Sequence, residues 1–458
     1  MAFLKLPENA RFSNKKIILF IIPIYIELLM VALISMADTY MVSGFGEAAV
    51  AGVALASNID KFVKQMFSGL AAGGSVVLSQ YIGAQNQLGA NKSLKTSIHA
   101  LFMLTLVVSA VMFIFKESIL SLIFGAVEAD VMENALTYFS ITTLSYPFVT
   151  LFNTATAAYR AMGNSKIALY TSLVMMLVSL LLKYIFIFVI KMGIVGAALS
   201  NLIAYALVGA VMILTLHGRQ NKAYLTKFFK PEFEFKMMSR IFKVGIPNGV
   251  ESGMFQFGLL LIQTVIATLG KNSIAAYSLT SSVTPLIHTV NGAFQLGILT
   301  FVAQCMGAEK PDEAGFYMKH IVRLNYVVNF VNASVMMILM PWIIKMYGME
   351  PATTSLALRS FYIYTGFALF FYPLAFALPN ALRGAGDTRF TMMISIITMF
   401  GIRLGMAYVF ILVLKMGIYG AWLAMTLEWI VKGGIFIVRA KKGKWRTIKV
   451  IESKAETA

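Results

Sequence analysis

The sequence predicts an all-α integral membrane protein with twelve transmembrane helices in two pseudo-symmetric six-helix bundles. Of its 458 residues, 59% are hydrophobic and only 13% are charged, whereas soluble domains carry about 25% charged residues. Long apolar runs recur along the whole chain, and a helix that spans a bilayer needs about 20 such residues. Short motifs of the first half return in the same order in the second half, which indicates two related bundles.

The internal repeat places matching residues 224 positions apart. Glu27 follows Pro23 by four residues, and Glu251 follows Pro247 by four residues. Other stretches also return, some with small shifts: 80–84 as 304–308, 191–197 as 415–421, Tyr146-Pro147 as Tyr372-Pro373, and Arg160 as Arg383. Two repeated lobes in an apolar chain favour a transporter that moves its substrate through the cleft between them.

Twelve apolar runs are long enough to span a membrane, six in each half. They lie near 17–42, 57–81, 96–115, 134–157, 168–190, 193–216, 243–268, 280–305, 322–344, 358–380, 390–414 and 417–438. An even number of spans returns the chain to its starting side, so both lobes share one orientation. We therefore expect a six-helix lobe at 1–216, a cytoplasmic linker at 217–242, a second six-helix lobe at 243–440 and a basic tail at 441–458.

The formal net charge is +18, and its distribution indicates membrane orientation rather than nucleic-acid binding. Lys and Arg gather in the two termini, in the central linker and in the loops that follow even-numbered spans. Positive residues stay on the cytoplasmic side, so we expect both termini in the cytoplasm and the protein in the inner (plasma) membrane. The basic cluster at 441–446 suits contact with anionic lipid.

The sequence lacks the motifs of an enzyme or a metal site. Cys305 is the only cysteine, and the four histidines have no metal-ligand spacing. No nucleophile elbow or paired-cysteine motif is present. We expect no enzymatic activity, no cofactor and no resident metal, and nothing favours an oligomer over a monomer.

An ionisable residue inside a spanning helix costs about 2.5–3.5 kcal/mol and therefore suggests function. The candidates for cation coupling are Asp38, Glu251 and Glu27, and the possible charge partners are Lys183 and Arg403. Glu27 and Asp38 are eleven residues apart, so they project from one face of a helix. Each of these residues also has a structural alternative. Glu27 could hydrogen-bond to another helix of its lobe, and Asp38 could lie near the external membrane interface. Lys183 and Arg403 could extend their side chains toward a membrane interface.

Three other polar residues have a simpler structural interpretation. Glu428 and Lys432 have the i, i+4 spacing that favours an ion pair within one helix. His288 follows Pro285 on an otherwise apolar helix, so we expect that this histidine packs against its neighbours.

Lys183 lies inside a predicted span and would need a counter-ion there. We expect that Asp38 provides it.

Several motifs together resemble the multidrug and toxic compound extrusion (MATE) family within the larger flippase and exporter superfamily. They are Met36-Ala37-Asp38-Thr39-Tyr40-Met41-Val42, Gly245-Ile246-Pro247 with Glu251-Ser252, and Leu382-Arg383-Gly384-Ala385-Gly386-Asp387-Thr388. The resemblance covers essentially the whole chain. It implies two six-helix bundles that form a V around a central cavity, and an antiport cycle in which an inward-moving cation drives an organic substrate outward. It also implies that Asp38 is central to cation coupling and that Glu251 contributes.

The chain departs from the sodium-coupled members of that family. Their additional acidic residue has no counterpart in Phe370-Phe371-Tyr372, and Ser179 and Lys183 stand where other members place Asn and Asp. A lysine does not fit an unchanged sodium site, so H⁺ and Na⁺ both remain open as the coupling ion.

We expect an antiporter that exports small organic, cationic compounds by alternating access. The main alternative is a flippase for a lipid-linked or other amphipathic substrate, although such a cavity would display more Lys and Arg than Lys183 and Arg403. A channel is disfavoured by the two-lobe repeat, and fold alone does not fix the substrate.

Overall fold

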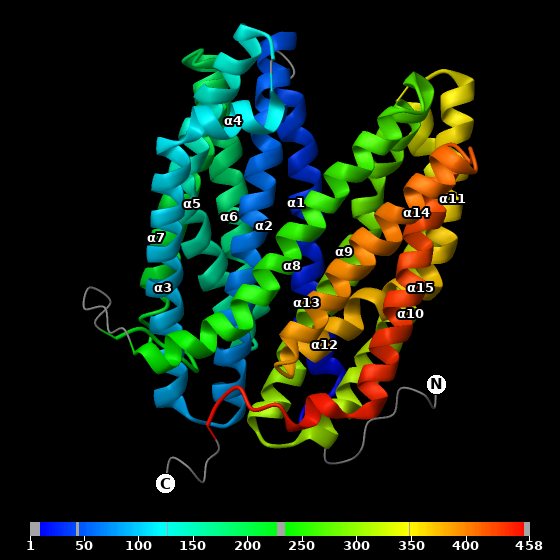
Figure 1. The fold of residues 1–458 in the computed structure, drawn as a ribbon. Coiled ribbons are helices and arrows are strands. Elements are labelled where there is room, and N and C mark those ends of the chain that lie inside the picture. Colours follow the sequence, from blue (N-terminus) through cyan, green and yellow to red (C-terminus); the bar gives the residue numbers. More distant parts are fainter. Residues whose placement is uncertain (1–9, 43–44, 126, 227–233, 348, 453–458) are drawn as a thin grey trace. The chain divides into compact units, whose positions relative to one another are not determined.

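The computed structural model describes residues 10–42, 45–125, 127–226, 234–347 and 349–452, with backbone only for 35–40, 42 and 346 (Figure 1). All regular elements in these ranges are helices, as the sequence predicts. The first half contains α1 (Asn14–Val42), α2 (Glu47–Gly83), α3 (Gln87–Ile114), α4 (Lys116–Phe124), α5 (Ala129–Ala161), α6 (Ser165–Tyr184), the π-helix η3 (Ile185–Val189) and α7 (Gly193–Thr215).

The second half begins with α8 (Phe235–Ala267), α9 (Lys271–Gly307), α10 (Pro311–Met346) and α11 (Pro351–Tyr372). It continues with η4 (Pro373–Ala377), α12 (Leu378–Gly384), α13 (Thr388–Ile397), η5 (Thr398–Leu404), α14 (Gly405–Tyr408), η6 (Val409–Val413), α15 (Ile418–Lys442) and the short η7 (Lys444–Thr447). The elements η4, η5 and η6 are π-helical.

Within the described residues, eleven helical stretches are long and apolar enough to cross a membrane. The twelfth expected span, 57–81, lies inside α2, which is 37 residues long. Charged residues and many Gly and Ser side chains lower the hydropathy of α2. Most of its residues are buried within the protein, so few of them need to be apolar enough to face lipid.

The repeat is visible in backbone geometry. The non-glycine residues with positive φ pair up at a spacing of 224: Gln85 (59°) with Glu309 (59°), and Lys191 (61°) with Lys415 (52°). The π-helices η3 and η6 have the same spacing. Positive φ is uncommon for non-glycine residues, so these matches confirm the two repeated halves.

The chain divides into two compact units. Unit 1 comprises Met1–Leu28 and Met254–Ala458, and unit 2 comprises Leu29–Gly253. The division follows the two halves of the repeat except in the first helix of each half. Residues of α1 up to Leu28 group with the second half, and residues of α8 up to Gly253 group with the first.

Unit 2 is built around α5, which contacts α2, α3 and α7. The first part of α8 joins this unit through a close glycine contact with α2. A Cβ atom added at Gly73 would lie 2.2 Å from the Cα of Gly245, and one at Gly69 would lie 2.5 Å from the carbonyl oxygen of Asn248. Small residues spaced by four let two helix backbones approach closely inside a membrane. Gly69 and Gly73 on α2 face such a pattern on α8.

In unit 1, the corresponding packing involves the first part of α1 and α9. Phe20 and Ile24 of α1 share a buried core with Val290 and Phe294 of α9. A Cβ atom added at Gly297, the repeat equivalent of Gly73, would lie 3.1 Å from the side chain of Ile21. Each half therefore receives the first part of the other half's first helix, through a close backbone contact at glycine in unit 2 and through apolar side chains in unit 1.

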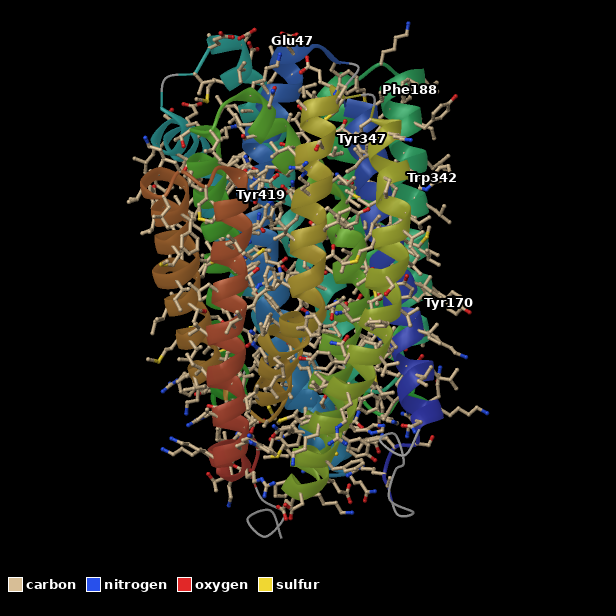
Figure 2. All side chains as sticks on the ribbon, turned by 90° about the vertical axis from the view of Figure 1, so that its right-hand side faces the viewer. Glu47, Tyr170, Phe188, Trp342, Tyr347 and Tyr419 are labelled. Carbon is tan, nitrogen blue, oxygen red and sulfur yellow. The ribbon has the colours of Figure 1, made fainter. Side chains whose placement is uncertain are left out.

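Large hydrophobic side chains cover the outer faces of both units. Trp342 on α10 is 70% exposed and Tyr170 on α6 is 63% exposed, and both point away from their helices (Figure 2). Such surfaces are unfavourable in water, and they fit helices whose outer faces contact lipid.

The Leu382–Thr388 motif has a structural role in unit 1. Gly386 has φ +97°, which favours glycine, and Gly384 lies so close to the backbone of α9 that an added Cβ would be 2.5 Å from the Leu299 oxygen. Asp387 accepts two hydrogen bonds from Arg439 of α15, at 2.7 and 3.1 Å. The motif therefore joins α12, α13, α9 and α15.

Gly73→Ala is expected to destabilise unit 2, because the new methyl group has no room against the backbone of α8. Overpacking of this kind costs about 1–3 kcal/mol, so the melting temperature in detergent should fall. Gly366→Ala is the matched control, since an added Cβ there meets no atom within 4 Å. Equal melting temperatures for the two variants would contradict the close α2–α8 contact.

Candidate functional site

Two of the predicted coupling carboxylates are buried at equivalent positions of the repeat. Glu27 on α1 is 5% exposed and lies in unit 1, and Glu251 on α8 is 6% exposed and lies in unit 2. Each follows, by one helical turn, a proline inside its helix, where the missing N–H weakens the backbone ladder. Both carboxylates also lie within two residues of the point where their helix passes from one unit to the other.

The third predicted carboxylate, Asp38, belongs to the last part of α1. Its side chain lies outside the described residues, so its relation to Glu27 and the expected link to Lys183 stay predictions. Lys183 itself is 3% exposed and lies in the last turn of α6, two residues before the start of η3. One turn earlier, the Ser179 hydroxyl donates to Asn201 of α7 at 2.9 Å.

Unit 2 contains an ion pair that the sequence analysis did not single out. Asp60 and Lys64 of α2 are separated by 2.8 Å, and Lys64 Nζ lies 5.8 Å from the ring centroid of Tyr205 on α7. Their i, i+4 spacing inside the predicted second span was the available signal. Glu428 and Lys432 of unit 1 have the same spacing.

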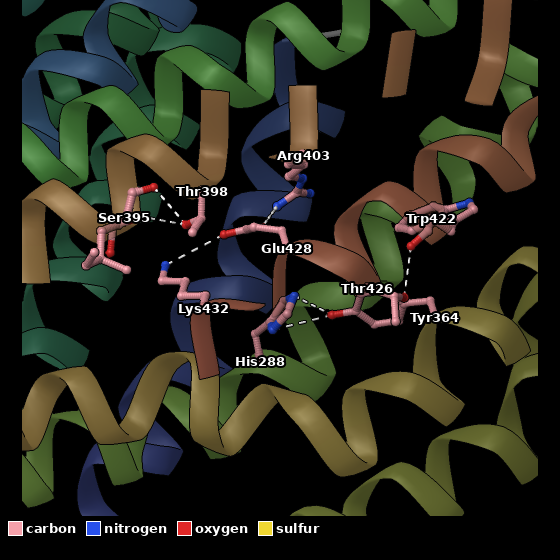
Figure 3. A network of polar contacts seen from close by, with 10 residues as sticks. His288, Tyr364, Ser395, Thr398, Arg403, Trp422, Thr426, Glu428 and Lys432 are labelled. Carbon is pink, nitrogen blue, oxygen red and sulfur yellow. Dashed lines mark hydrogen bonds and ion pairs between the residues drawn. The ribbon is translucent and has the colours of Figure 1, made fainter. Parts of the chain in front are cut away.

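Unit 1 contains a buried cluster of three charges, which we call the charge triad: Arg403, Glu428 and Lys432 (Figure 3). Arg403 Nη1 lies 3.5 Å from Glu428 Oε2, and Lys432 Nζ lies 3.7 Å from Glu428 Oε1. The expected pair of Glu428 and Lys432 is therefore present, and Arg403 joins it from η5. With two positive groups and one negative group, the triad has a net charge of +1 when all three are ionised.

Aromatic rings of unit 1 surround the cations of the triad. Lys432 Nζ lies 4.6 Å from the ring centroid of Phe376, and Arg403 lies 5.9 Å from that of Phe255. A cation is attracted to the face of an aromatic ring, so these rings partly replace the hydration that the buried charges have lost.

His288 lies beside the triad and packs as expected. Its Nε2 lies 2.6 Å from the hydroxyl of Tyr364 (Figure 3), and its ring lies 4.7 Å from that of Tyr372. Tyr372 in turn contacts Trp429 at 5.3 Å. This arrangement confirms a histidine held by aromatic neighbours.

The polar clusters of the two units occupy equivalent places in the repeat. Lys64 is 224 residues before His288, and Tyr205 is 224 residues before Trp429. The clusters nevertheless differ in charge, because the three charged residues of the triad, Arg403, Glu428 and Lys432, correspond to the uncharged Ser179, Ala204 and Val208 of the first half. Arg403 also lies in the π-helical segment η5, whereas Ser179 lies in the regular helix α6. Short π-helical segments are frequent at functional sites.

The structure thus brings Arg403 together with Glu428, and it places Glu27 and Glu251 in separate units. In the described part of the chain, no three His, Cys, Asp or Glu side chains form a group able to hold a metal ion.

Comparison with known proteins identifies the class to which this arrangement belongs. A family model described as MatE matches residues 23–185 and again residues 247–409, once in each half. An uncharacterized transporter of Bacillus subtilis, YisQ, is 26% identical over 436 residues, which cover 93% of this chain and 92% of that protein. The "Probable multidrug resistance protein NorM" of Thermotoga maritima is 21% identical, over 96% of this chain and 94% of its own length.

Solved structures share the fold. A multidrug resistance MATE family transporter in an outward-facing conformation superposes with a TM-score of 0.84 at 19% identity, covering 96% of this chain and 99% of the other. A transporter of the same superfamily from Pyrococcus furiosus gives a TM-score of 0.87 at 18% identity, covering 95% and 97%, and is described as having a binding pocket of reverse polarity. The family match spans both halves, and the chain therefore belongs to the MATE family of multi-pass membrane transporters, whose members are not enzymes.

Proposed function

We propose that the chain is an antiporter that couples the inward movement of H⁺ or Na⁺ to the export of small organic, cationic compounds. In this proposal it acts as a monomer in the inner membrane, with both termini and the central linker in the cytoplasm. The relatives named as multidrug resistance proteins support drug-like substrates. The positive residues of the linker and the tail support the orientation.

The observation that carries this proposal is the equivalent burial of Glu27 and Glu251. A carboxylate on a helix inside the membrane can bind a proton, a metal cation or an organic cation. These ligands compete, because one carboxylate cannot hold all of them at once. Competition of this kind is what an antiporter requires, because the exported compound must leave when the coupling ion binds.

The position of the two carboxylates suggests how binding changes conformation. Each lies where its helix passes from one unit to the other, close to a proline that weakens the helix. A change of charge at this point alters local packing where the helix bends most easily. For coupling to result, the ion and the substrate must favour opposite states, since a ligand with equal affinity for both states shifts nothing.

A second candidate function is transport of an anionic amphipathic substrate. The net positive charge of the triad favours it, and so does the reverse polarity reported for the Pyrococcus furiosus structure. In the first candidate, the triad instead has a structural role within unit 1, and the carboxylates select the substrate.

Transport by the purified protein in liposomes distinguishes these candidates. A fluorescent organic cation is followed under an imposed pH gradient or an imposed Na⁺ gradient, and a fluorescent anionic lipid is followed in parallel. Movement of the cation under one gradient alone supports the antiporter and identifies its ion. If the anionic lipid moves and the organic cation does not, the second candidate function is supported and the first is rejected.

Glu251→Gln and Glu27→Gln are expected to reduce gradient-driven transport of the cation by about tenfold or more, which corresponds to a loss of about 1.4 kcal/mol. The amide keeps the size of the side chain but cannot carry the negative charge. Glu117→Gln, at an exposed position of α4, is the control and should transport normally. If both buried variants also transport normally, these carboxylates have no role in coupling.

Asp38→Asn is expected to abolish coupled export while the protein remains in the membrane, because the resemblance makes Asp38 central to cation coupling. The amount of the variant in the membrane fraction is compared with that of the wild type, and gradient-driven uptake is measured after both proteins are purified and reconstituted at equal amounts in liposomes. Normal export by this variant would remove Asp38 from the mechanism.

Glu428→Gln is expected to destabilise unit 1, because it leaves Arg403 and Lys432 buried without their shared counter-charge. Removing one partner of a buried ion pair costs about 3–5 kcal/mol, which thermal unfolding in detergent would detect. The paired change Glu428→Gln with Lys432→Met should recover part of this loss. An unchanged melting temperature in the single variant would show that the triad does not stabilise the fold.

A further inference from the structure

We propose that unit 1 carries a binding site for one anionic glycerophospholipid on the outer face of α15. The site is a groove of about 470 Å³, lined by Phe390 of α13, by five residues of α15 from Ile430 to Val438, and by three basic residues in the last turn of α15 and the start of η7. This volume lies in the range of about 300–1,000 Å³ typical of ligand pockets. None of the groove's lining residues belongs to the charge triad, and neither Glu27 nor Glu251 is among them.

The wall of the groove is apolar and faces outward. Ile430 is 42% exposed and Val438 is 51% exposed, on a helix long and apolar enough to cross a membrane. Gly434 creates space between them, since a Cβ atom added there would meet no heavy atom within 4 Å. A lipid acyl chain is apolar and narrow, so it can lie in the space at Gly434 and contact the side chains of Ile430 and Val438.

Basic side chains stand at one end of the groove only. Arg439, Lys442 and Lys444 line that end. The guanidinium of Arg439 is already bound to Asp387 and lies 4.4 Å from the ring centroid of Phe390. Lys442 and Lys444 are exposed and have no ion-pair partner among residues 10–452 that are described. The charge available to a ligand therefore comes from these two lysines.

The backbone around Lys444 is held in place by the protein. Gly443 ends α15 with φ +70°, a left-handed conformation suited to glycine. Next to Lys444, the buried indole of Trp445 donates a hydrogen bond to the Ala440 carbonyl at 3.0 Å. Arg446 then pairs with Asp312 of α10 at 3.0 Å. These contacts fix the short helix η7 against unit 1, so both lysines are positioned before a ligand arrives.

An anionic phospholipid matches this combination of features. Its acyl chain would lie along the apolar wall, and its phosphate-containing headgroup would lie by Lys442 and Lys444. Each basic residue near a membrane surface strengthens the attraction of anionic lipid by roughly fivefold, which corresponds to about 1 kcal/mol. A zwitterionic lipid offers the same acyl chain without the net charge, so the site should prefer phosphatidylglycerol over phosphatidylcholine.

The test is native mass spectrometry of the full chain in detergent, titrated with phosphatidylglycerol or with phosphatidylcholine. The wild-type protein should bind a first phosphatidylglycerol molecule more tightly than phosphatidylcholine. The double variant Lys442→Gln with Lys444→Gln should lose this preference, with phosphatidylglycerol bound about tenfold or more weakly. Gly434→Phe, which fills the groove, should weaken both lipids.

Two matched controls separate the groove from general effects of charge and size. Lys441→Gln with Lys449→Gln removes the same charge from exposed positions outside the groove. Gly366→Phe adds the same side chain at another open glycine. Both controls should bind lipid as the wild type does. Equal affinity of the wild type for the two lipids would overturn the proposal, as would equal losses in the lysine variants and their charge control. If Gly434→Phe fails to fold in size-exclusion chromatography, the lysine variants decide.

Discussion

The close approach of α2 and α8 at glycine is the constraint on which the arrangement of unit 2 depends. Water is absent from the lipid, so burial of apolar side chains gives little drive for helices to associate there. Gly69 and Gly73 instead let the backbone of α8 come close enough for extensive van der Waals contact. This contact holds the first part of α8 in unit 2, although α8 belongs by sequence to the second half. The α1–α9 contact has the same consequence in unit 1.

This exchange of helix segments gives the two proline-associated glutamates their distinctive position. If α1 and α8 each stayed within one unit, Glu27 and Glu251 would be ordinary buried acids of separate bundles. Each helix instead changes unit within two residues of its glutamate. The repeat places this arrangement in both halves, so the proposed coupling mechanism includes two equivalent carboxylates.

The two halves have nevertheless diverged in their charges. Where unit 2 has Ser179, unit 1 has Arg403, and the arginine is accompanied by Glu428, Lys432 and a set of aromatic rings. The backbone has diverged at the same place, since η5 is π-helical and its counterpart in α6 is not. Repetition thus supplies the scaffold, while substitutions inside the scaffold make the two polar clusters chemically different.

The sequence by itself determined the fold class, the repeat and the pairing of Glu428 with Lys432. These features depend on local properties: the length of apolar runs, matching residues at a fixed spacing, and the geometry of i, i+4 pairs. Tertiary structure alone decided that α1 and α8 are divided between the units, that Arg403 completes the charge triad, and that a groove ends at Lys442 and Lys444. Each of these depends on backbones and side chains that are distant in sequence. Their contacts follow from how closely particular helices approach, which neither hydropathy nor residue spacing specifies.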